Sequence, residues 1–280
     1  MVRQILHKTK LFGVLLAIIF FASSSATSAA PNWDTNTIQV TGMGVANPAL
    51  ATTPAHASML ARRAAVADAY RQLAEEINGV QVDSETTVQN MMIKSDEVRT
   101  RVNALIKNAR IVSEGELAGG GYSVTMAIGI FGGTDSLADK VLERPAYVEP
   151  IPAPAPEYRP PVVQTQPDYQ GGGYTGLIID CRDFDDVNHV MSPVILDENG
   201  KKIYGHKNLD FDRIIREGMV YYAHDMSQTS RAGSNPLIVR ALWLEGHNAN
   251  PVISDEDAEF VLYENSKSHF LEDIAVVFLH

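Results

Sequence analysis

The chain has 280 residues, of which 34 are acidic and 23 are basic, so its formal net charge is −11 at pH 7. A negative surface repels phosphate backbones and anionic lipids, which argues against nucleic-acid binding and against peripheral attachment to membranes. The single cysteine, Cys181, has no partner in the chain for a disulfide, so burial of apolar side chains must hold the fold together.

The first thirty residues have the pattern of a secretory signal peptide. Three basic residues precede an apolar run from Leu11 to Ala22, which at about a dozen residues is shorter than the roughly 20 that span a bilayer. We predict a signal peptide over residues 1–29, with no transmembrane anchor after cleavage. Cleavage removes those three basic residues and no acidic ones, which lowers the net charge from −11 to −14. The expected location is periplasmic or secreted, and association with the outer membrane stays open.

After the signal peptide, the apolar pattern predicts a first domain over residues 37–143. We expect, in order, a strand (37–46), a long helix that starts at Thr53-Pro54 and ends at Asn78-Gly79, a strand (80–88), a helix capped by Ser95, two strands of a hairpin (110–117 and 122–131) and a short helix (135–142). Two helices packed on an antiparallel sheet is the natural assembly of these elements.

The long helix is amphipathic, with an apolar stripe and a charged face. We expect the stripe to contain Met59, Val66, Tyr70, Leu73 and Ile77, with Ala61, Ala65 and Ala69 at its flank so that another element can approach closely. Two arginines of this helix, Arg62 and Arg63, are the candidate contacts to a protein partner.

This order of elements resembles the bacterial twenty-kilodalton envelope lipoprotein family, which is similar in turn to the amino-terminal domain of the flagellar assembly protein FlgT. The resemblance covers about residues 37–142. It rests most on Ala61, Arg62, Ala64, Ala65, Ala69, Tyr70, Leu73 and Gly79. The resemblance implies an α+β envelope protein, in several cases linked to outer-membrane or flagellar-basal structures, without agreed catalytic residues. This chain lacks the lipidated cysteine of the lipoprotein members.

A proline-rich linker is predicted over residues 144–173. Eight of the 14 prolines lie between Pro145 and Pro167. Because proline lacks an amide donor and favours the extended polyproline II conformation, we expect a spacer that can hold two domains tens of Å apart.

The remaining residues, 174–280, have the pattern of a second α+β domain. We expect a strand (174–181), a hairpin (194–197 and 201–204) around Asn199-Gly200, a helix from Asp210 to Glu217, strands at 219–223 and 237–244, a helix from Ser254 to about Lys267 and a strand at 274–279. The predicted fold class is therefore α+β, with two small domains, each an antiparallel sheet packed by two or so helices.

An acidic segment after the first strand of the second domain is the candidate metal site. Asp183, Asp185, Asp186 and His189 offer the oxygen and imidazole ligands that a divalent cation needs. The spacing of an EF-hand loop is absent, so a solvated loop is the alternative.

Catalytic and cofactor-binding residues are not predicted. The other histidines lack the HExxH spacing of zinc sites, and no GxSxG motif marks a nucleophilic serine. Whether His189 and His224 converge in space stays open. Cys181 is expected to be a buried small apolar residue, Trp243 to lie in the core, and Trp33 to lie in a mobile start of the mature chain.

The preferred hypothesis is a non-catalytic exported envelope protein, a scaffold or assembly factor that binds outer-membrane or flagellar-basal proteins. The alternative is a periplasmic module that binds a small molecule or metal around Asp180 to His189. A hydrolase is the third hypothesis. It requires His, Asp and Ser residues that are distant in the sequence to meet in the fold. No cofactor is expected, and the oligomeric state is left open.

Overall fold

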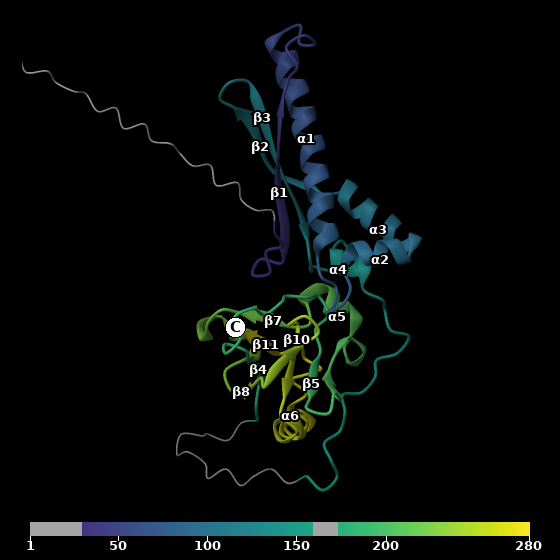
Figure 1. Cartoon of the computed structure of the whole chain (residues 1–280), viewed down its shortest axis with the longest axis vertical. Coiled ribbons are helices and arrows are strands. Elements are labelled where there is room, and N and C mark those ends of the chain that lie inside the picture. The colour runs from purple at the N-terminus through teal and green to yellow at the C-terminus, as the bar shows by residue number, and fades with distance from the viewer. Residues whose placement is uncertain (1–29, 159–172) are drawn as a thin grey trace, which may run out of the picture.

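The computed structural model describes residues 30–158 and 173–280 (Figure 1). The predicted signal peptide and the second half of the predicted linker lie outside these residues. Two α+β domains follow one another along the long axis of the molecule, the first over residues 30–143 and the second over residues 174–280. The predicted two-domain α+β fold is confirmed. In the described part of the chain, no helix is both long and apolar enough to cross a membrane.

The first domain is a three-stranded antiparallel sheet covered on one face by a long helix. Its elements are β1 (Thr37–Val45), α1 (Pro54–Gly79), α2 (Val88–Lys94), α3 (Asp96–Lys107), β2 (Arg110–Leu117), β3 (Gly121–Gly129) and α4 (Leu137–Val141). The strand order is β1-β3-β2, and β3 is the central strand. The predicted strand at 80–88 is wrong, because this segment makes only the isolated bridge between Gln81 and Thr87 and then enters α2.

Small residues bring α1 and β1 into direct backbone contact. A Cβ atom on Gly42 would lie 2.2 Å from the amide nitrogen of Ala69, and one on Gly44 would lie 2.3 Å from the carbonyl oxygen of Ala61. The buried face of α1 is therefore the alanine stripe continued by Leu73 and Ile77. Met59, predicted to belong to the buried stripe, is exposed instead, because the sheet meets the helix through the alanines.

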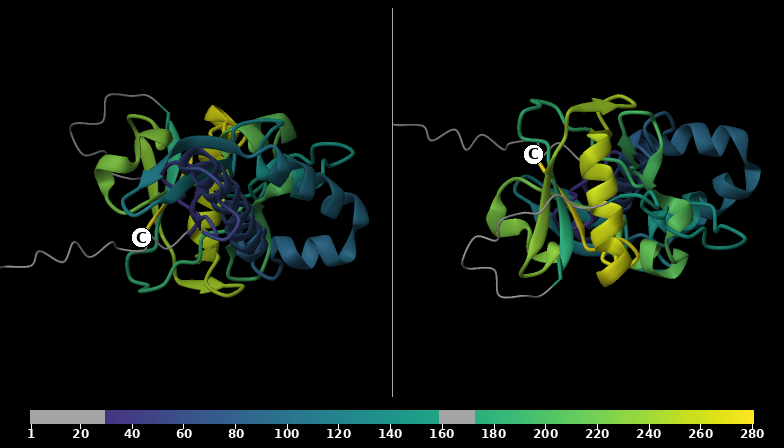
Figure 2. Two further views of the ribbon diagram at one scale, coloured as in Figure 1. Left: turned by 90° about the horizontal axis from the view of Figure 1, so that it is seen from above. Right: turned by 90° about the horizontal axis from the view of Figure 1, so that it is seen from below.

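The second domain contains two four-stranded sheets. Its strands are β4 (Gly176–Asp180), β5 (Ile195–Asp197), β6 (Lys202–Tyr204), β7 (Tyr221–Ala223), β8 (Pro236–Arg240), β9 (Trp243–Glu245), β10 (Asn250–Ile253) and β11 (Val276–Leu279). Its helices are η1 (His206–Asn208), α5 (Phe211–Glu217), η2 (Met226–Gln228), η3 (Ser230–Ala232) and α6 (Asp255–Ser268). Seen from below, α6 lies across the side of this domain that faces away from the first (Figure 2).

An antiparallel sheet was the expectation for the second domain, and this part of the prediction is wrong. The sheet in the order β7-β11-β4-β8 is parallel throughout, and the sheet in the order β6-β5-β10-β9 is mixed. The reason lies in the continuous apolar runs of β4 and β11, which are buried almost without a break. Strands buried on both faces are typical of parallel sheets, whereas alternating strands suit antiparallel ones.

The predicted strand at 237–244 is two strands in two different sheets. The chain leaves β8 at Arg240 and enters β9 at Trp243, so the segment passes from the parallel sheet to the mixed sheet. Trp243 is consequently 38% exposed rather than part of the core.

A continuous apolar core joins the two domains. The amides of Gly132 and Gly133 donate to the carbonyl of Ile215 at 2.9 Å each, and the amide of Ser192 donates to the carbonyl of Val82 at 2.8 Å. Phe131, at the end of the first domain, packs against Gly218 of the second. Backbone hydrogen bonds together with shared apolar burial hold the domains in contact, which excludes the predicted separation by tens of Å.

The described half of the proline-rich segment follows the surface of the second domain. The amide of Glu149 donates to the carbonyl of Lys207 at 2.8 Å, and the amide of Ala155 donates to Glu259 Oε2 at 2.5 Å. The Tyr158 ring lies 5.9 Å from that of Tyr263 on α6. Residues 145–158 are thus a strap held by hydrogen bonds, rather than the free spacer that their composition predicted.

Candidate functional site: the histidine cluster and the free sheet edge

The parallel sheet gathers chemistry-bearing residues at one edge. Because the carboxyl ends of parallel strands meet at the same side of a sheet, the residues that follow β4, β7 and β11 become neighbours. His224 follows β7, His280 follows β11, and His189 comes from the loop after β4. We call these three residues the histidine cluster.

The histidine cluster is tightly packed. His189 Nε2 lies 2.9 Å from His280 Nε2, so one imidazole donates to the other. The rings of His224 and His280 are 4.7 Å apart and steeply inclined. His189 also stacks on Tyr222 with 4.1 Å between ring centroids. The tyrosine is fixed in turn, because its hydroxyl bonds to both the amide and the carbonyl of Val190.

Burial favours the neutral form of two members of this cluster, His189 and His280. Desolvation, followed by the proximity of His280 and His224, lowers the pKa of His189 to about 4. Desolvation and His224 also lower the pKa of His280. Trp33 of the first domain covers the cluster, since its ring meets His189 at 5.9 Å and Tyr222 at 5.8 Å. Trp33 is therefore part of the contact between the domains, and its predicted place in a mobile segment is wrong.

The cluster's arrangement suits packing better than catalysis or metal binding. In residues 30–158 and 173–280, no group of three or more His, Cys, Asp or Glu side chains is placed to hold a metal ion. The neighbouring thiol is Cys181, which is buried as predicted, and its burial raises its pKa to about 12. A thiol with such a pKa is a weak nucleophile at neutral pH.

The predicted metal ligands Asp183, Asp185, Asp186 and His189 are not brought together. Asp183 is ion-paired with Arg240, while Asp185 and Asp186 are exposed. His189 points inward to His280 instead of toward the acidic loop. The alternative function centred on this loop loses its ligand set for the same reason.

Asp180 at the start of that loop is neutralised by Arg182. Their hydrogen bonds, at 2.9 and 2.6 Å, lower the pKa of the aspartate. Arginine partners thus satisfy the carboxylates of Asp180 and Asp183, which leaves the exposed Asp185 and Asp186 as the carboxylates of the loop for which no ion pair is seen among the described residues.

The candidate partner contacts Arg62 and Arg63 lie side by side on α1 but differ in their surroundings. Arg62 crosses to β2 and pairs with Glu114 at 2.8 Å. Arg63 is exposed and makes no ion pair with a described residue. Ser58 and Glu116 form a second bond between α1 and β2 at 2.5 Å. The acidic side chains of β2 are therefore tied to the helix, and Arg63 is the residue left available to a partner.

The outer edge of β2 is open in the described structure. β2 pairs with β3 along one side, and no described strand pairs along its other side. Seven of its eight residues are exposed, among them the apolar Ile111 and Val112 beside an irregularity in the pairing. Such an edge presents unpaired backbone donors and acceptors to another chain. We call it the free edge.

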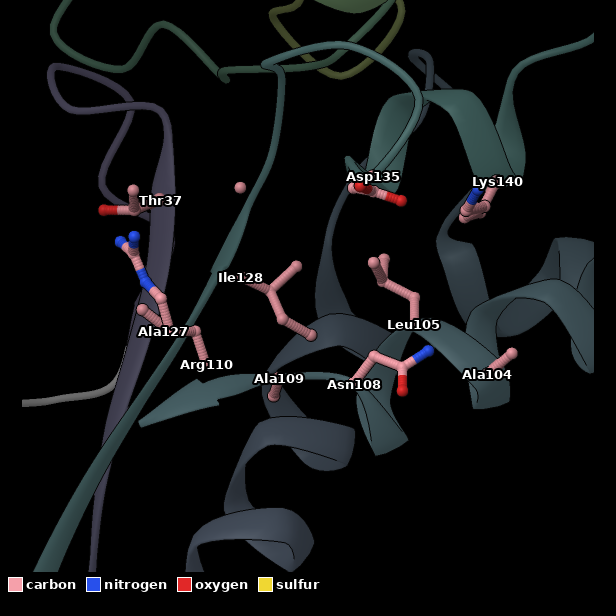
Figure 3. A pocket seen from close by; sticks show the side chains of 11 residues that line it. Thr37, Ala104, Leu105, Asn108, Ala109, Arg110, Ala127, Ile128, Asp135 and Lys140 are labelled. Atoms are coloured by element: carbon pink, nitrogen blue, oxygen red, sulfur yellow. The ribbon is translucent and has the colours of Figure 1, made fainter. Parts of the chain in front are cut away.

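Two cavities are large enough for a small molecule. One, of about 730 Å³, lies between α3 and β3, where Leu105 and Ile128 point into the space and Asp135 and Lys140 lie at its rim (Figure 3). Lys140 already bonds to Asp139 at 2.8 Å and to the carbonyl of Thr134 at 2.6 Å. The other, of about 830 Å³, lies where the strap, the 83–86 loop and the second domain meet. Neither cavity contains an assembled catalytic group.

Comparison with known proteins finds a likeness for each domain. Residues 29–128 match the LPP20 lipoprotein family, which agrees with the resemblance seen in the sequence of the first domain. Residues 176–280 match the second domain of Treponema pallidum Tp0624. Each match spans less than half of the 280 residues. No curated protein matches the chain.

The sequence did not reveal which residues form the contact between the two domains, which we call the seam, or that β2 has a free edge. His280 and His224 follow short apolar strands, and a correct prediction of parallel pairing would have placed them together. Trp33 had no detectable pattern, because its contacts come from residues about 100 to 190 positions away. Predicting the free edge would have required the order of the strands in the sheet, which the alternation of apolar residues does not specify.

Proposed function

We propose that this protein is an exported, non-catalytic scaffold of the cell envelope that binds a protein partner along the free edge of its first domain. Main-chain hydrogen bonds from β2 would add a strand of the partner to the sheet. The exposed Ile111 and Val112 would supply side-chain contacts at this edge. Recognition by strand addition draws its affinity from the backbone and its specificity from alternate side chains.

The free edge is the observation that carries this proposal. β2 has eight residues, which is long enough for several inter-strand hydrogen bonds, and its charged side chains Glu114 and Glu116 are held by α1 rather than placed across the edge. Exposed edges are commonly protected by charged side chains, proline or β-bulges. β2 contains no proline, and Arg110 and the pairing irregularity lie at its first end, so the segment from Ser113 to Leu117 is open to an incoming strand.

Two observations support an envelope location. The amino-terminal pattern is that of a secretory signal peptide, and the first domain is similar to a family of lipoproteins. The relation to FlgT stays a prediction. It makes flagellar-basal proteins, together with outer-membrane proteins, the first partners to examine.

Substitution on the free edge tests the proposal. Val112→Lys places a charge on the edge without touching the helix. In intact cells treated with a crosslinker, the parent chain should capture an envelope protein, and Val112→Lys should reduce that capture by about tenfold. Ile238→Lys is the matched control, since Ile238 is an exposed apolar residue on β8, an edge strand of the other domain. Equal capture by the parent and by Val112→Lys would refute binding at this edge.

A further inference from the structure

The end of the first domain that lies farthest from the second domain is apolar. Here β1 ends, the 46–53 loop leads into α1, and the β2–β3 hairpin turns (Figure 1). We call this end the distal tip. Four large apolar side chains are exposed on or just below it, with exposed fractions between 39 and 75%: Val45, Leu50, Met59 and Leu117. Gly120 of the hairpin and residues of the 46–53 loop line the same shallow hollow of about 410 Å³.

The two chain segments that form the distal tip contain no Asp, Glu, Lys or Arg. Residues 42–61 contain no Asp, Glu, Lys or Arg, although such residues make up 20% of the whole chain. The hairpin residues 117–121 contain none either. His56 is the titratable side chain of the 42–61 segment, and it is hydrogen-bonded to the Thr52 hydroxyl at 3.1 Å. The acidity of the molecule is therefore located elsewhere, and the repulsion inferred from its net charge does not apply to this end.

Charged residues begin as a collar below the tip. Arg62 and Arg63 of α1 and Glu114 of β2 are its members, and Glu116 lies nearer the tip, where it accepts a hydrogen bond from Ser58. At about 1.5 Å per residue, Arg63 lies about 13 Å along α1 from Pro54. A headgroup layer is roughly 5 to 8 Å deep on each side of a bilayer, and amphipathic elements sink about 5 to 10 Å into the boundary between headgroups and acyl chains. A tip that reached the acyl chains would thus leave the collar level with the phosphates.

The composition of the tip favours lipid over protein as its occupant. Protein interfaces are enriched in aromatic residues, methionine and arginine at their centre, whereas residues 42–61 contain no Phe, Tyr, Trp or Arg. Its polar groups are backbone amides of the turns and the side chains of Asn47, Thr52, Thr53, His56 and Ser58, which suit the hydrated headgroup layer. Because the rest of the molecule is acidic, the matching surface is zwitterionic rather than anionic.

We propose that the distal tip inserts into the surface of a zwitterionic lipid bilayer, with Val45, Leu50 and Leu117 at the acyl boundary and Arg63 at the phosphates. This contact is independent of the free edge. A scaffold could bind its partner at β2 whether or not its tip enters a membrane, so the two proposals fail separately.

A tryptophan placed at the tip tests the insertion. Leu50→Trp and, as the matched control, Ile238→Trp in the second domain are prepared in the chain from Ala30 to His280. Each is mixed with phosphatidylcholine vesicles with and without brominated acyl chains, and the emission of the parent chain, from Trp33 and Trp243, is subtracted. We expect a blue shift and quenching by the brominated lipid for Leu50→Trp, and neither for Ile238→Trp. Absence of quenching at Leu50→Trp, or equal quenching at both positions, would overturn the proposal.

A second variant separates insertion from other causes of a spectral shift. Val45→Asp combined with Leu50→Asp should weaken sedimentation with the vesicles by about tenfold or more, since a carboxylate is costly among acyl chains. Ile238→Asp should sediment as the parent chain does. The far-ultraviolet circular dichroism of both variants verifies folding. A shift of Leu50→Trp that grows with protein concentration in the absence of lipid would instead assign the tip to a second copy of the chain, and would also overturn the proposal.

Discussion

At the scale of single residues, burial determines what the polar groups can do. Cys181 and His189 are reactive residue types, yet burial raises the pKa of the thiol to about 12 and lowers that of the imidazole to about 4. Both groups are consequently neutral at physiological pH. The thiol, whose burial was correctly predicted, therefore acts as a buried apolar group, and the imidazole contributes to the contact between the domains by packing against Trp33.

The depressed pKa of His189 predicts a loss of stability in acid. An unfolded histidine titrates near 6.5, so the unfolded state takes up a proton more readily than the folded state does. The penalty is absent above about pH 6.5, grows as the pH falls toward 4, and is complete below about 4. Allowing for partial exposure, it amounts to about 2 to 3 kcal/mol.

Removing the titrating group tests this assignment. His189→Gln should flatten the decline of the unfolding free energy between pH 6.5 and 4, as measured by urea denaturation at several pH values. His56→Gln, near the distal tip, is the control for the loss of one histidine. If the profiles of His189→Gln and the parent run parallel, the proton is taken up elsewhere.

At the scale of elements, the contact between α1 and β1 explains why small residues recur in the first domain. Gly42 and Gly44 leave room for the helix backbone, and Ala61, Ala65 and Ala69 occupy the face that meets them. The sequence predicted the helix and the strand correctly, because amphipathic period and capping are local signals. It placed Leu73 and Ile77 correctly on the buried face but put Met59 there and the alanines at the flank, because the closeness of the contact depends on the glycines of a different element.

Substituting Gly42 should therefore destabilise the first domain. A Cβ at this position would meet backbone atoms of Ala65 and Ala69 at 2.2 to 2.7 Å, and backbone cannot move aside as a side chain can. We expect Gly42→Ala to lower the unfolding free energy by about 1 to 3 kcal/mol. Gly115→Ala in β2 is the matched control, because nothing lies within 4 Å of a Cβ there. Urea denaturation that shows equal midpoints for the two variants would contradict the close contact.

In the second domain and in the linker, too, the sequence predicted local features but not contacts between distant elements. The apolar run of β4 was recognised as a buried strand, but the parallel partners β8 and β11 are distant in sequence, so the pairing direction was missed. Proline content correctly excluded regular structure from residues 145–158. It did not reveal the hydrogen bonds to Lys207 and Glu259 that bind this segment as a strap, because those depend on the tertiary fold.

At the scale of the whole molecule, the two domains are in contact and present different surfaces at different places. Trp33, Phe131 and backbone hydrogen bonds form the contact between the two domains. The free edge and the distal tip both lie on the first domain, away from the histidine cluster. Composition predicted two domains with an acidic surface. The distal tip and the free edge could be located only from the three-dimensional arrangement.

Binding of a protein at the free edge is the central claim, and site-specific photocrosslinking in intact cells tests it most directly. A photoreactive residue is introduced at Val112 on the edge and, separately, at Ile238 on β8 of the second domain, and the adducts are identified by mass spectrometry. The predicted result is a defined adduct with one envelope protein from Val112 and no such adduct from Ile238. No adduct from Val112, or the same adducts from both positions, would contradict the claim.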